Sequence, residues 1–323
     1  MSFSTTAGTS RTIEKLVPAT DTGKLNRLIG TLDIDGQGTD HPLAEVDPFI
    51  LLDESTIPKN AMPPFGAHPH RGHSVVTILT QGKYSSWDSF RPTTSEKHAM
   101  TGHASYWVDA GSGVFHDEQS IIENEDDPTQ HCRLFQLWVG VKQEDRLLPP
   151  KVQIDNDLPS FDCKDPVSGT VVGKGIYHVG PETKIVTPHP IVVAYIRQEP
   201  NTVYHVPVDP THAGFVVHIQ GQSKFGEGTS TTVPTNKNDV LVLSTTCSSG
   251  DANQFLRVET NQEAGEYLVC TGEPHGEKWA KKLVANGAII AATAEEARAL
   301  APSVETMAAS GKAGKSFAPF GME

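Results

Sequence analysis

The sequence predicts an all-β protein, a sandwich or barrel built in two halves. Short runs rich in β-branched and aromatic residues recur along the chain, separated by 28 glycines and 23 prolines. Each half contains a run that ends in a Gln-Gly turn, at Gln81-Gly82 and at Gln220-Gly221. Helical periodicity is confined to the region near the C-terminus.

The predicted elements follow in chain order. In the first half we expect strands at Phe49–Leu52, Val75–Leu79, Tyr106–Val108 and Leu134–Val139. A proline-rich break at Leu148–Pro150 precedes the second half, with strands expected at Thr170–Val172, Ile191–Ile196, Asn201–Val206, Gly214–Ile219, Asp239–Leu243 and Gly265–Cys270. Helical segments are expected at Trp279–Val284 and Glu295–Leu300, and Ser310–Ser316 is expected to be a flexible tail.

Composition narrows the classes of function. The 323 residues carry a formal net charge of −13, and no Lys/Arg cluster stands out, so direct nucleic-acid binding is not expected. No apolar run reaches the roughly 18 residues needed to cross a bilayer, and the polar N-terminus lacks a secretory core. The four cysteines are far apart and have no C-x-x-C spacing, which favours reduced thiols in the cytosol or nucleus.

Two short motifs point to a metal site. Side chains at i and i+2 of an extended chain point to the same face, so His68 and His70 would converge, as would His116 and Glu118. Three imidazoles and one carboxylate form a mixed N/O ligand set for a divalent metal, with room for water or substrate. A single His-Pro-His, by contrast, is commonly only a surface turn. The combination of the two motifs favours the metal site.

These motifs resemble those of the pirin family of the cupin superfamily. The resemblance lies in the run from Asp47 to Glu54, Ala67–Gly72, Ala110–Glu118, Leu134–Val139 and Gly272-Glu273-Pro274, and it covers roughly residues 10–300. It implies a bicupin, meaning two stacked antiparallel jelly-roll β-barrels, here with a short C-terminal helical segment. The expected domains are an N-terminal tail with the first strand (1–25), an N-terminal barrel (26–146), a C-terminal barrel (147–300) and a flexible tail (301–323).

The resemblance also implies one metal, of the iron type, in the N-terminal barrel. The family's ligands correspond to His68, His70, His116 and Glu118. The ligand set alone would accept iron, manganese, nickel, copper or zinc. The second barrel is expected to hold no metal, and its lone His212 has no partner at i±2. No organic cofactor is expected.

Three functions are open. The resemblance implies a metal-dependent dioxygenase acting on flavonol (quercetin-type) aromatic substrates with O₂, in which Glu118 is either a pure ligand or also the catalytic proton acceptor. It equally allows a non-catalytic, redox-sensing transcription cofactor with a transcription factor as its protein partner. A third function is a lyase or isomerase that uses the metal as a Lewis acid. The expected location is the cytoplasm, the nucleus or both.

Some residues depart from the family pattern or remain ambiguous. His73 and Ser74 stand where pirins usually have an aromatic residue and then a glutamate. His73 has the opposite parity to the ligand pair, so a structural or rim position is expected. His103 either approaches the pocket or lies in a solvated turn. Arg71 is expected to pair with a carboxylate or an anionic substrate, or to form a structural ion pair, and Asp117 to point away from the metal.

Overall fold

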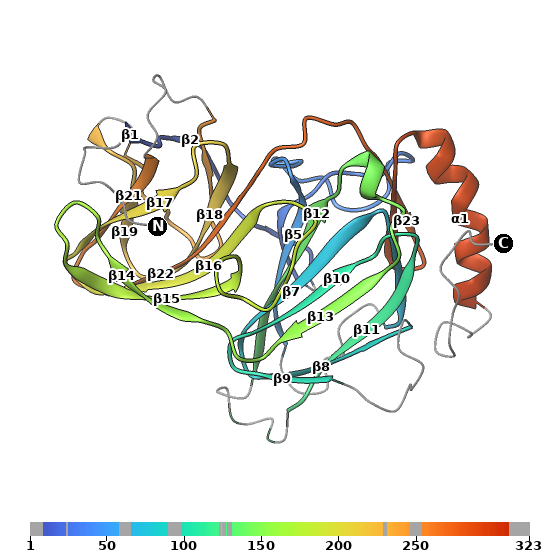
Figure 1. Cartoon of the computed structure of the whole chain (residues 1–323), viewed down its shortest axis with the longest axis horizontal. Coiled ribbons are helices and arrows are strands. Elements are labelled where there is room, and N and C mark those ends of the chain that lie inside the picture. The colour runs from blue at the N-terminus through green and yellow to red at the C-terminus, as the bar shows by residue number, and fades with distance from the viewer. Residues whose placement is uncertain are drawn as a thin grey trace. The chain divides into compact units, whose positions relative to one another are not determined.

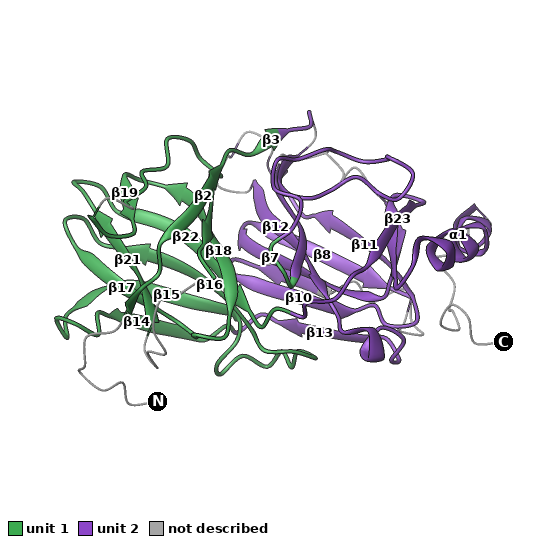
Figure 2. Ribbon diagram, turned by 90° about the horizontal axis from the view of Figure 1, so that it is seen from above, with its two compact units in different colours: residues 1–20, 46–48, 158–274 green, residues 21–45, 49–157, 275–323 purple. Residues whose placement is uncertain are grey.

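The computed structural model describes residues 9–23, 25–57, 66–89, 98–122, 124, 127, 131–228, 231–245 and 254–309. Figure 1 shows β-strands throughout and one α-helix, α1 (Ala294–Ala309), near the C-terminus of the described chain. The predicted all-β class is therefore confirmed. The chain divides into two compact units, coloured separately in Figure 2: unit 1 is residues 1–20, 46–48 and 158–274, and unit 2 is residues 21–45, 49–157 and 275–323.

Unit 1 contains two sheets. The larger has the strand order β14-β15-β16-β22-β18-β20-β2, and the smaller has the order β1-β21-β17 with β19 also paired to β21. The bounds are β1 Thr9–Ser10, β2 Ile13–Val17, β14 Ser160–Lys164, β15 Val171–Val179, β16 Ile191–Gln198, β17 Val203–Val208, β18 Ala213–Gln220, β19 Ser223–Phe225, β20 Val240–Leu243, β21 Gln254–Thr260 and β22 Gly265–Gly272.

Unit 2 also contains two sheets, ordered β13-β10-β7-β12-β5-β4-β3 and β23-β24-β6-β11-β8-β9. The bounds are β3 Thr20–Asp21, β4 Asn26–Ile29, β5 Phe49–Ile57, β6 His68–Arg71, β7 His73–Gln81, β8 Lys83–Asp88, β9 His98–Thr101, β10 Ala104–Asp109, β11 Val114–Ser120, β12 Cys132–Gly140, β13 Lys151–Asp155, β23 Ala280–Val284 and β24 Gly287–Ala291. A 3₁₀ turn, η2, spans Gln143–Asp145.

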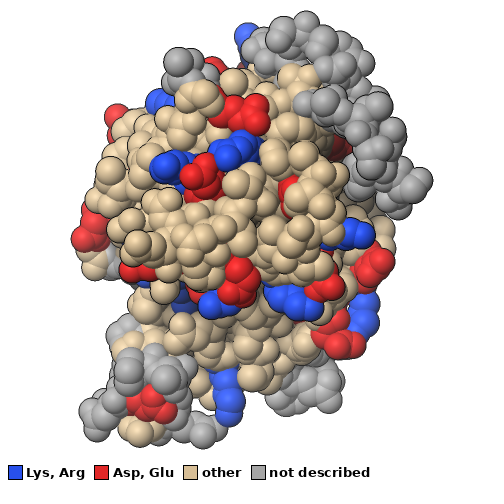
Figure 3. Space-filling view, turned by 90° about the vertical axis from the view of Figure 1, so that its left-hand side faces the viewer, with Lys and Arg blue, Asp and Glu red and all other residues tan. Residues whose placement is uncertain are grey.

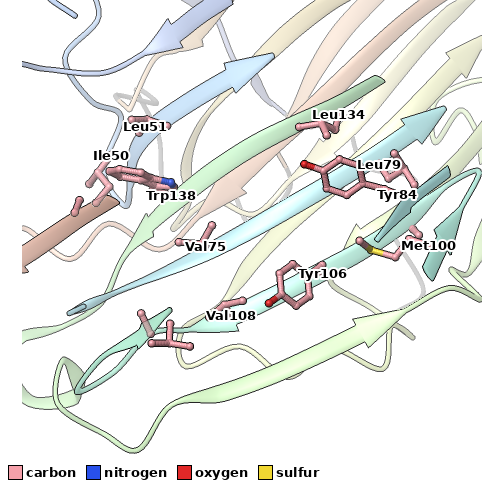
Figure 4. Packing of buried hydrophobic residues seen from close by; sticks show 14 of the residues in the cluster. Ile50, Leu51, Val75, Leu79, Tyr84, Met100, Tyr106, Val108, Leu134 and Trp138 are labelled. Carbon is pink, nitrogen blue, oxygen red and sulfur yellow. The ribbon is translucent and has the colours of Figure 1, made fainter. Parts of the chain in front are cut away.

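The two sheets of unit 2 enclose a core that includes large aromatic side chains. Figure 4 shows Trp138 beside Ile50 and Leu51, and Tyr84 beside Leu79, all from one buried cluster. Strand alternation places Leu79 and Tyr84 inward, whereas the consecutive residues Ile50 and Leu51 both reach the cluster at an irregularity in the pairing of β5 with β12. The functional side chains described below extend from strands that this core holds in place.

All ten predicted strands overlap observed strands, but the end of the chain differs from expectation. The prediction of a helix at Trp279–Val284 was wrong, because Ala280–Val284 is strand β23. It turns into β24 through Ala285 and Asn286, whose φ angles of 48° and 67° are typical of a tight hairpin turn. The tail predicted from residue 301 is helical as far as Ala309, and Ser310–Ser316 lies outside the described residues.

Each terminal segment belongs to the unit formed mainly by the other half of the chain. Residues 1–20 are assigned to unit 1 and residues 275–323 to unit 2. Strand β24 joins unit 2 by parallel pairing with β6, and β2 joins unit 1 by antiparallel pairing with β20. The four-part domain division predicted from the sequence did not include this exchange, and its boundary at residues 146 and 147 stays a proposal.

The surface carries charges of both signs. On the face drawn in Figure 3, Lys and Arg side chains lie among Asp and Glu side chains. This mixture differs from the one-sided basic surface typical of nucleic-acid binding. Within the described part of the chain, no helix is long and apolar enough to cross a membrane.

Candidate metal centre

Strands β6 and β11 bring the three predicted histidines together. The two strands pair antiparallel with His68 opposite His116 and with His70 opposite Val114. Because i and i+2 share a face, His70 lies on the same side as His68. One ligand nitrogen from each histidine lies within 4.8 Å of the others, and all three residues are buried. The sequence therefore located the histidine cluster correctly.

Hydrogen bonds orient the imidazole of His68. Its Nδ1 lies 2.6 Å from the carbonyl oxygen of Gly66, and a carbonyl can only accept, so Nδ1 carries the proton of the neutral ring. The lone pair is then on Nε2, which lies 2.9 Å from Nε2 of His116. Two imidazole nitrogens this close, on adjacent strands, suit either a direct N–H···N bond or a shared metal ion.

Two of the three histidines carry a buried nitrogen that makes no hydrogen bond to a described residue. Among the described residues, Nε2 of His70 and Nδ1 of His116 have no hydrogen-bond partner, although both are shielded from solvent. A buried nitrogen without a partner costs about 1–3 kcal/mol, and a metal bond to Nε2 of His70 would offset that cost at His70. The residues present therefore fit a metal ion held by three imidazoles.

Burial also keeps these histidines in the form that binds metals. It holds the pKa of His68 below its ordinary value and the pKa values of His70 and His116 well below it. His68 and His116 further disfavour a charge on His70, and His68 disfavours a charge on His116, since like charges repel. The cluster is accordingly neutral at neutral pH, with lone pairs available to a cation.

Glu118, the fourth predicted ligand, lies on β11 two residues beyond His116. It accepts a hydrogen bond from the Thr77 hydroxyl on β7, a contact that joins the two sheets of unit 2. Burial raises the pKa of Glu118 to about 7, and the Asp117 carboxylate adds to the increase. Its carboxylate is not within the 4.8 Å group formed by the histidines. Its roles as metal ligand and as proton acceptor stay predictions.

A cavity of about 470 Å³ opens beside the cluster, within unit 2. His68 and Glu118 lie on its wall. Apolar and aromatic side chains make up another part of the wall, namely Leu51, Ile57, Tyr84, Leu134, Trp138 and Leu283. Its charged wall residues include Arg27 and Asp53, which form an ion pair with each other, and Lys281. A space of this size is in the range of small-molecule sites, about 300–1,000 Å³.

The remaining residues singled out in the sequence fall into different roles. Arg71 donates to the Ser112 carbonyl, a structural contact rather than one with a ligand carboxylate. Ser74 donates to Asp109 over 2.7 Å. Asp117 accepts from the Glu118 backbone N–H and also borders the cavity, so it does not simply point away. His103 lies in the turn before β10, outside the described cavity wall.

The structure decides between the two positions expected for His73, structural or rim. His73 is only 1% exposed, so it does not lie on a rim. Its Nε2 lies 3.1 Å from Nδ1 of His70, and its ring is 5.0 Å from that of Trp138. Sequence reasoning missed Thr77 and the stacking of Tyr106 on His116, with ring centroids 5.9 Å apart.

Comparison with known proteins agrees with this geometry. The family model named Pirin matches residues 33–139, which contain all four predicted ligands. A pirin-like protein from Solanum lycopersicum is 29% identical over 201 residues, which are 62% of this chain and 64% of that protein. The part of the chain that contains the histidine cluster is therefore similar to the pirin family. The chain spans somewhat less than two thirds of the length of this tomato relative.

Solved structures define the fold of this chain. A quercetin 2,3-dioxygenase from Acinetobacter baumannii superposes with a TM-score of 0.69 at 20% identity, covering 95% of this chain and 100% of that one. The bacterial pirin YhhW from Escherichia coli, in complex with nickel(II), superposes with a TM-score of 0.54 at 13% identity, covering 80% of this chain and 99% of that one. The fold is that of the bicupin pirins, as the resemblance implied.

Proposed function

We propose that this protein is a metal-dependent dioxygenase that acts on flavonol-type aromatic compounds. The observation that carries the proposal is a neutral three-histidine cluster beside a cavity large enough for a drug-sized ring system. The quercetin 2,3-dioxygenase from Acinetobacter baumannii has the same fold, which agrees with this substrate class. A redox metal held by the cluster would supply coordination positions at which O₂ and a substrate hydroxyl meet.

The protein's own residues would bind and orient the substrate. Trp138, Leu51 and Leu134 offer flat apolar surface to an aromatic ring, and burying such a ring removes apolar area from water. Glu118 lies on the same wall as His68, where it would accept the proton of a substrate hydroxyl. The apolar part of the cavity wall would limit the access of bulk water to the reacting oxygen atoms.

Iron is the metal that we propose, following the family resemblance. The histidine cluster itself does not discriminate strongly among metals, since imidazole ligands suit iron, nickel, copper and zinc. The nickel(II) complex of the pirin from Escherichia coli illustrates that breadth. Metal analysis of protein purified without added metal identifies the ion directly.

The test combines that metal analysis with oxygen consumption. Metal-loaded protein is expected to consume O₂ with quercetin, and His70→Ala to lose both metal and turnover. The control is His41→Ala, which removes another buried histidine of unit 2, one that contacts the backbone of Leu43. Full activity of the metal-free protein would overturn the proposal.

The same measurements distinguish the other two predicted functions. Turnover without O₂ uptake, retained with zinc, would identify a Lewis-acid lyase or isomerase instead. Metal binding without turnover on any flavonol, together with a protein partner whose binding depends on the metal's oxidation state, would identify a redox-sensing transcription cofactor. The cytoplasmic or nuclear location stays a prediction, tested by imaging a tagged full-length chain.

A further inference from the structure

His73 contacts His70, one of the three histidines of the candidate metal centre. Nδ1 of His70 and Nε2 of His73 are 3.1 Å apart, and the rings meet edge to face at 77°. Both residues are buried, His70 at 0% and His73 at 1% exposure. Water therefore does not compete for the hydrogen bond between these two rings.

The backbone determines which nitrogen carries each proton. Nδ1 of His73 lies 3.0 Å from the carbonyl oxygen of Arg71, which can only accept. The His73 ring is buried, and in its neutral form its single proton is on Nδ1, the nitrogen that donates to this carbonyl. Nε2 of His73 is then a bare acceptor, and the N–H of the 3.1 Å contact must come from Nδ1 of His70.

This chain of hydrogen bonds leaves Nε2 of His70 with a lone pair. That nitrogen is buried and has no hydrogen-bond partner among the described residues. Trp138 restricts rotation of the pair, because its ring lies 5.2 Å from that of His70 and 5.0 Å from that of His73. A rotated His70 ring would lose the His73 acceptor and meet the indole.

The bend at Gly72 makes the contact geometrically accessible. Gly72 has a φ of 79°, a backbone conformation that residues other than glycine rarely adopt. A Cβ at this position would lie 2.1 Å from the Ile290 carbonyl oxygen. The chain therefore leaves β6 and enters β7 through a turn, and His73 folds back beneath His70. In an uninterrupted strand, the two side chains would point to opposite faces.

We infer that His73 is a positioning residue, which fixes the proton and ring orientation of His70 so that Nε2 of His70 faces the metal. The inference rests on the proposed metal binding and extends it to a residue where this chain departs from the family pattern. The partner is a neutral imidazole rather than a carboxylate, so it orients His70 without adding negative charge to the centre. Residues that support metal ligands in this way typically contribute about 10–100-fold to metal affinity.

The experiment compares His73→Leu with His73→Gln in the full chain. Leucine cannot accept a hydrogen bond, whereas the glutamine amide can accept from His70 and donate to the Arg71 carbonyl. ¹⁵N-histidine NMR of the metal-free protein reports which nitrogen of His70 is protonated, and titration with nickel(II) reports affinity. His41→Leu, at a buried histidine of the same unit, is the matched control.

Wild-type protein and His73→Gln are expected to show the Nδ1–H form of His70 and similar nickel affinity. His73→Leu is expected to lose that single form and to bind nickel about 10–100-fold more weakly. A wild-type spectrum with the His70 proton on Nε2, or a folded His73→Leu with unchanged spectrum and affinity, would overturn the inference. If wild-type protein binds no metal, the proposed function fails, while the NMR comparison still decides the role of His73. If His73→Leu does not fold, the wild-type spectrum and His73→Gln decide it.

Discussion

Replacing Gly287 with alanine should displace the strand that supports the ligand histidines. Gly287 begins β24, which runs parallel to β6 with Ala288 opposite His70. A Cβ at position 287 would lie 1.8 Å from the carbonyl oxygen of Pro69, the residue between the two ligands. Ordinary contact begins at 3.4 Å, so the strands must separate by the difference between these distances, about 1.6 Å.

The expected cost follows from that displacement. A separation of this size breaks hydrogen bonds between β24 and β6, each with a net value of about 1 kcal/mol. Strain from an added methyl group in a packed site is typically about 1–3 kcal/mol. We therefore expect Gly287→Ala to lower the free energy of unfolding of unit 2 by about 2–4 kcal/mol. Sites built to bind tolerate shifts of only about 0.5 Å, so nickel affinity should fall at least about tenfold.

Calorimetric unfolding of the metal-free protein and nickel titration test the two parts of this prediction. Gly102→Ala is the control: Gly102 is also in unit 2, has a φ of 68°, and has nothing within 4 Å of its would-be Cβ. That control should lose about 1–2 kcal/mol through backbone strain alone and keep wild-type affinity. If Gly287→Ala loses less than the control and binds nickel normally, β24 does not hold β6 in place as argued.

Three further predictions concern unit 2. Burial alone would raise the pKa of Asp33, but backbone N–H donors led by Gln37 lower it to about 2 from 3.8. The ionised carboxylate therefore adds at most about 2 kcal/mol of stability above pH 4, and this stability is lost as the pH falls through 2. Asp33→Asn should remove this loss of stability when denaturant unfolding at pH 6 is compared with unfolding at pH 2, and equal pH dependence in both proteins would contradict it. Nickel at about 100 times its Kd should stabilise the wild type against unfolding by about 2.7 kcal/mol, and a chelator should reverse this effect. His116→Ala should not be stabilised by nickel, and stabilisation of this variant would contradict the proposed histidine site. Thr77→Val keeps shape but removes the hydroxyl bonded to Glu118, so unfolding should cost about 1–3 kcal/mol less, whereas unchanged stability would mean that the bond is dispensable.

The sequence was sufficient to predict the strands whose own residues determine their conformation. Runs such as Ile191–Ile196 are rich in β-branched residues, and this run lies inside β16. The segment from Trp279 to Val284 was ambiguous, because positions i and i+4 share a face both in a helix and in a strand. Trp279 and Leu283 indeed pack on one core cluster from an extended segment. Asn286 followed by Gly287 is a turn signal at this end of the segment, although the turn residues in the structure are Ala285 and Asn286.

The exchange of terminal segments could not be predicted, since it depends on contacts between distant parts of the chain. Strand β24 pairs with β6 through Ala288 and His70, and no local pattern near either residue specifies the other. The close approach needs a glycine at position 287, but glycines within strands also occur at bulges and at sharp bends. Parallel pairing of this kind is therefore visible only in three dimensions.

The histidine site shows where reasoning from strand parity holds and where it stops. Parity placed His68 with His70 correctly because both lie in β6 without interruption. The same rule placed His73 on the opposite face, but it applies only while the backbone stays extended. At Gly72 the φ of 79° ends one strand and begins another, so the parity count restarts at His73. A glycine two residues after a ligand pair thus signals that the next side chain can turn back toward the ligands, and a histidine there can orient one of them.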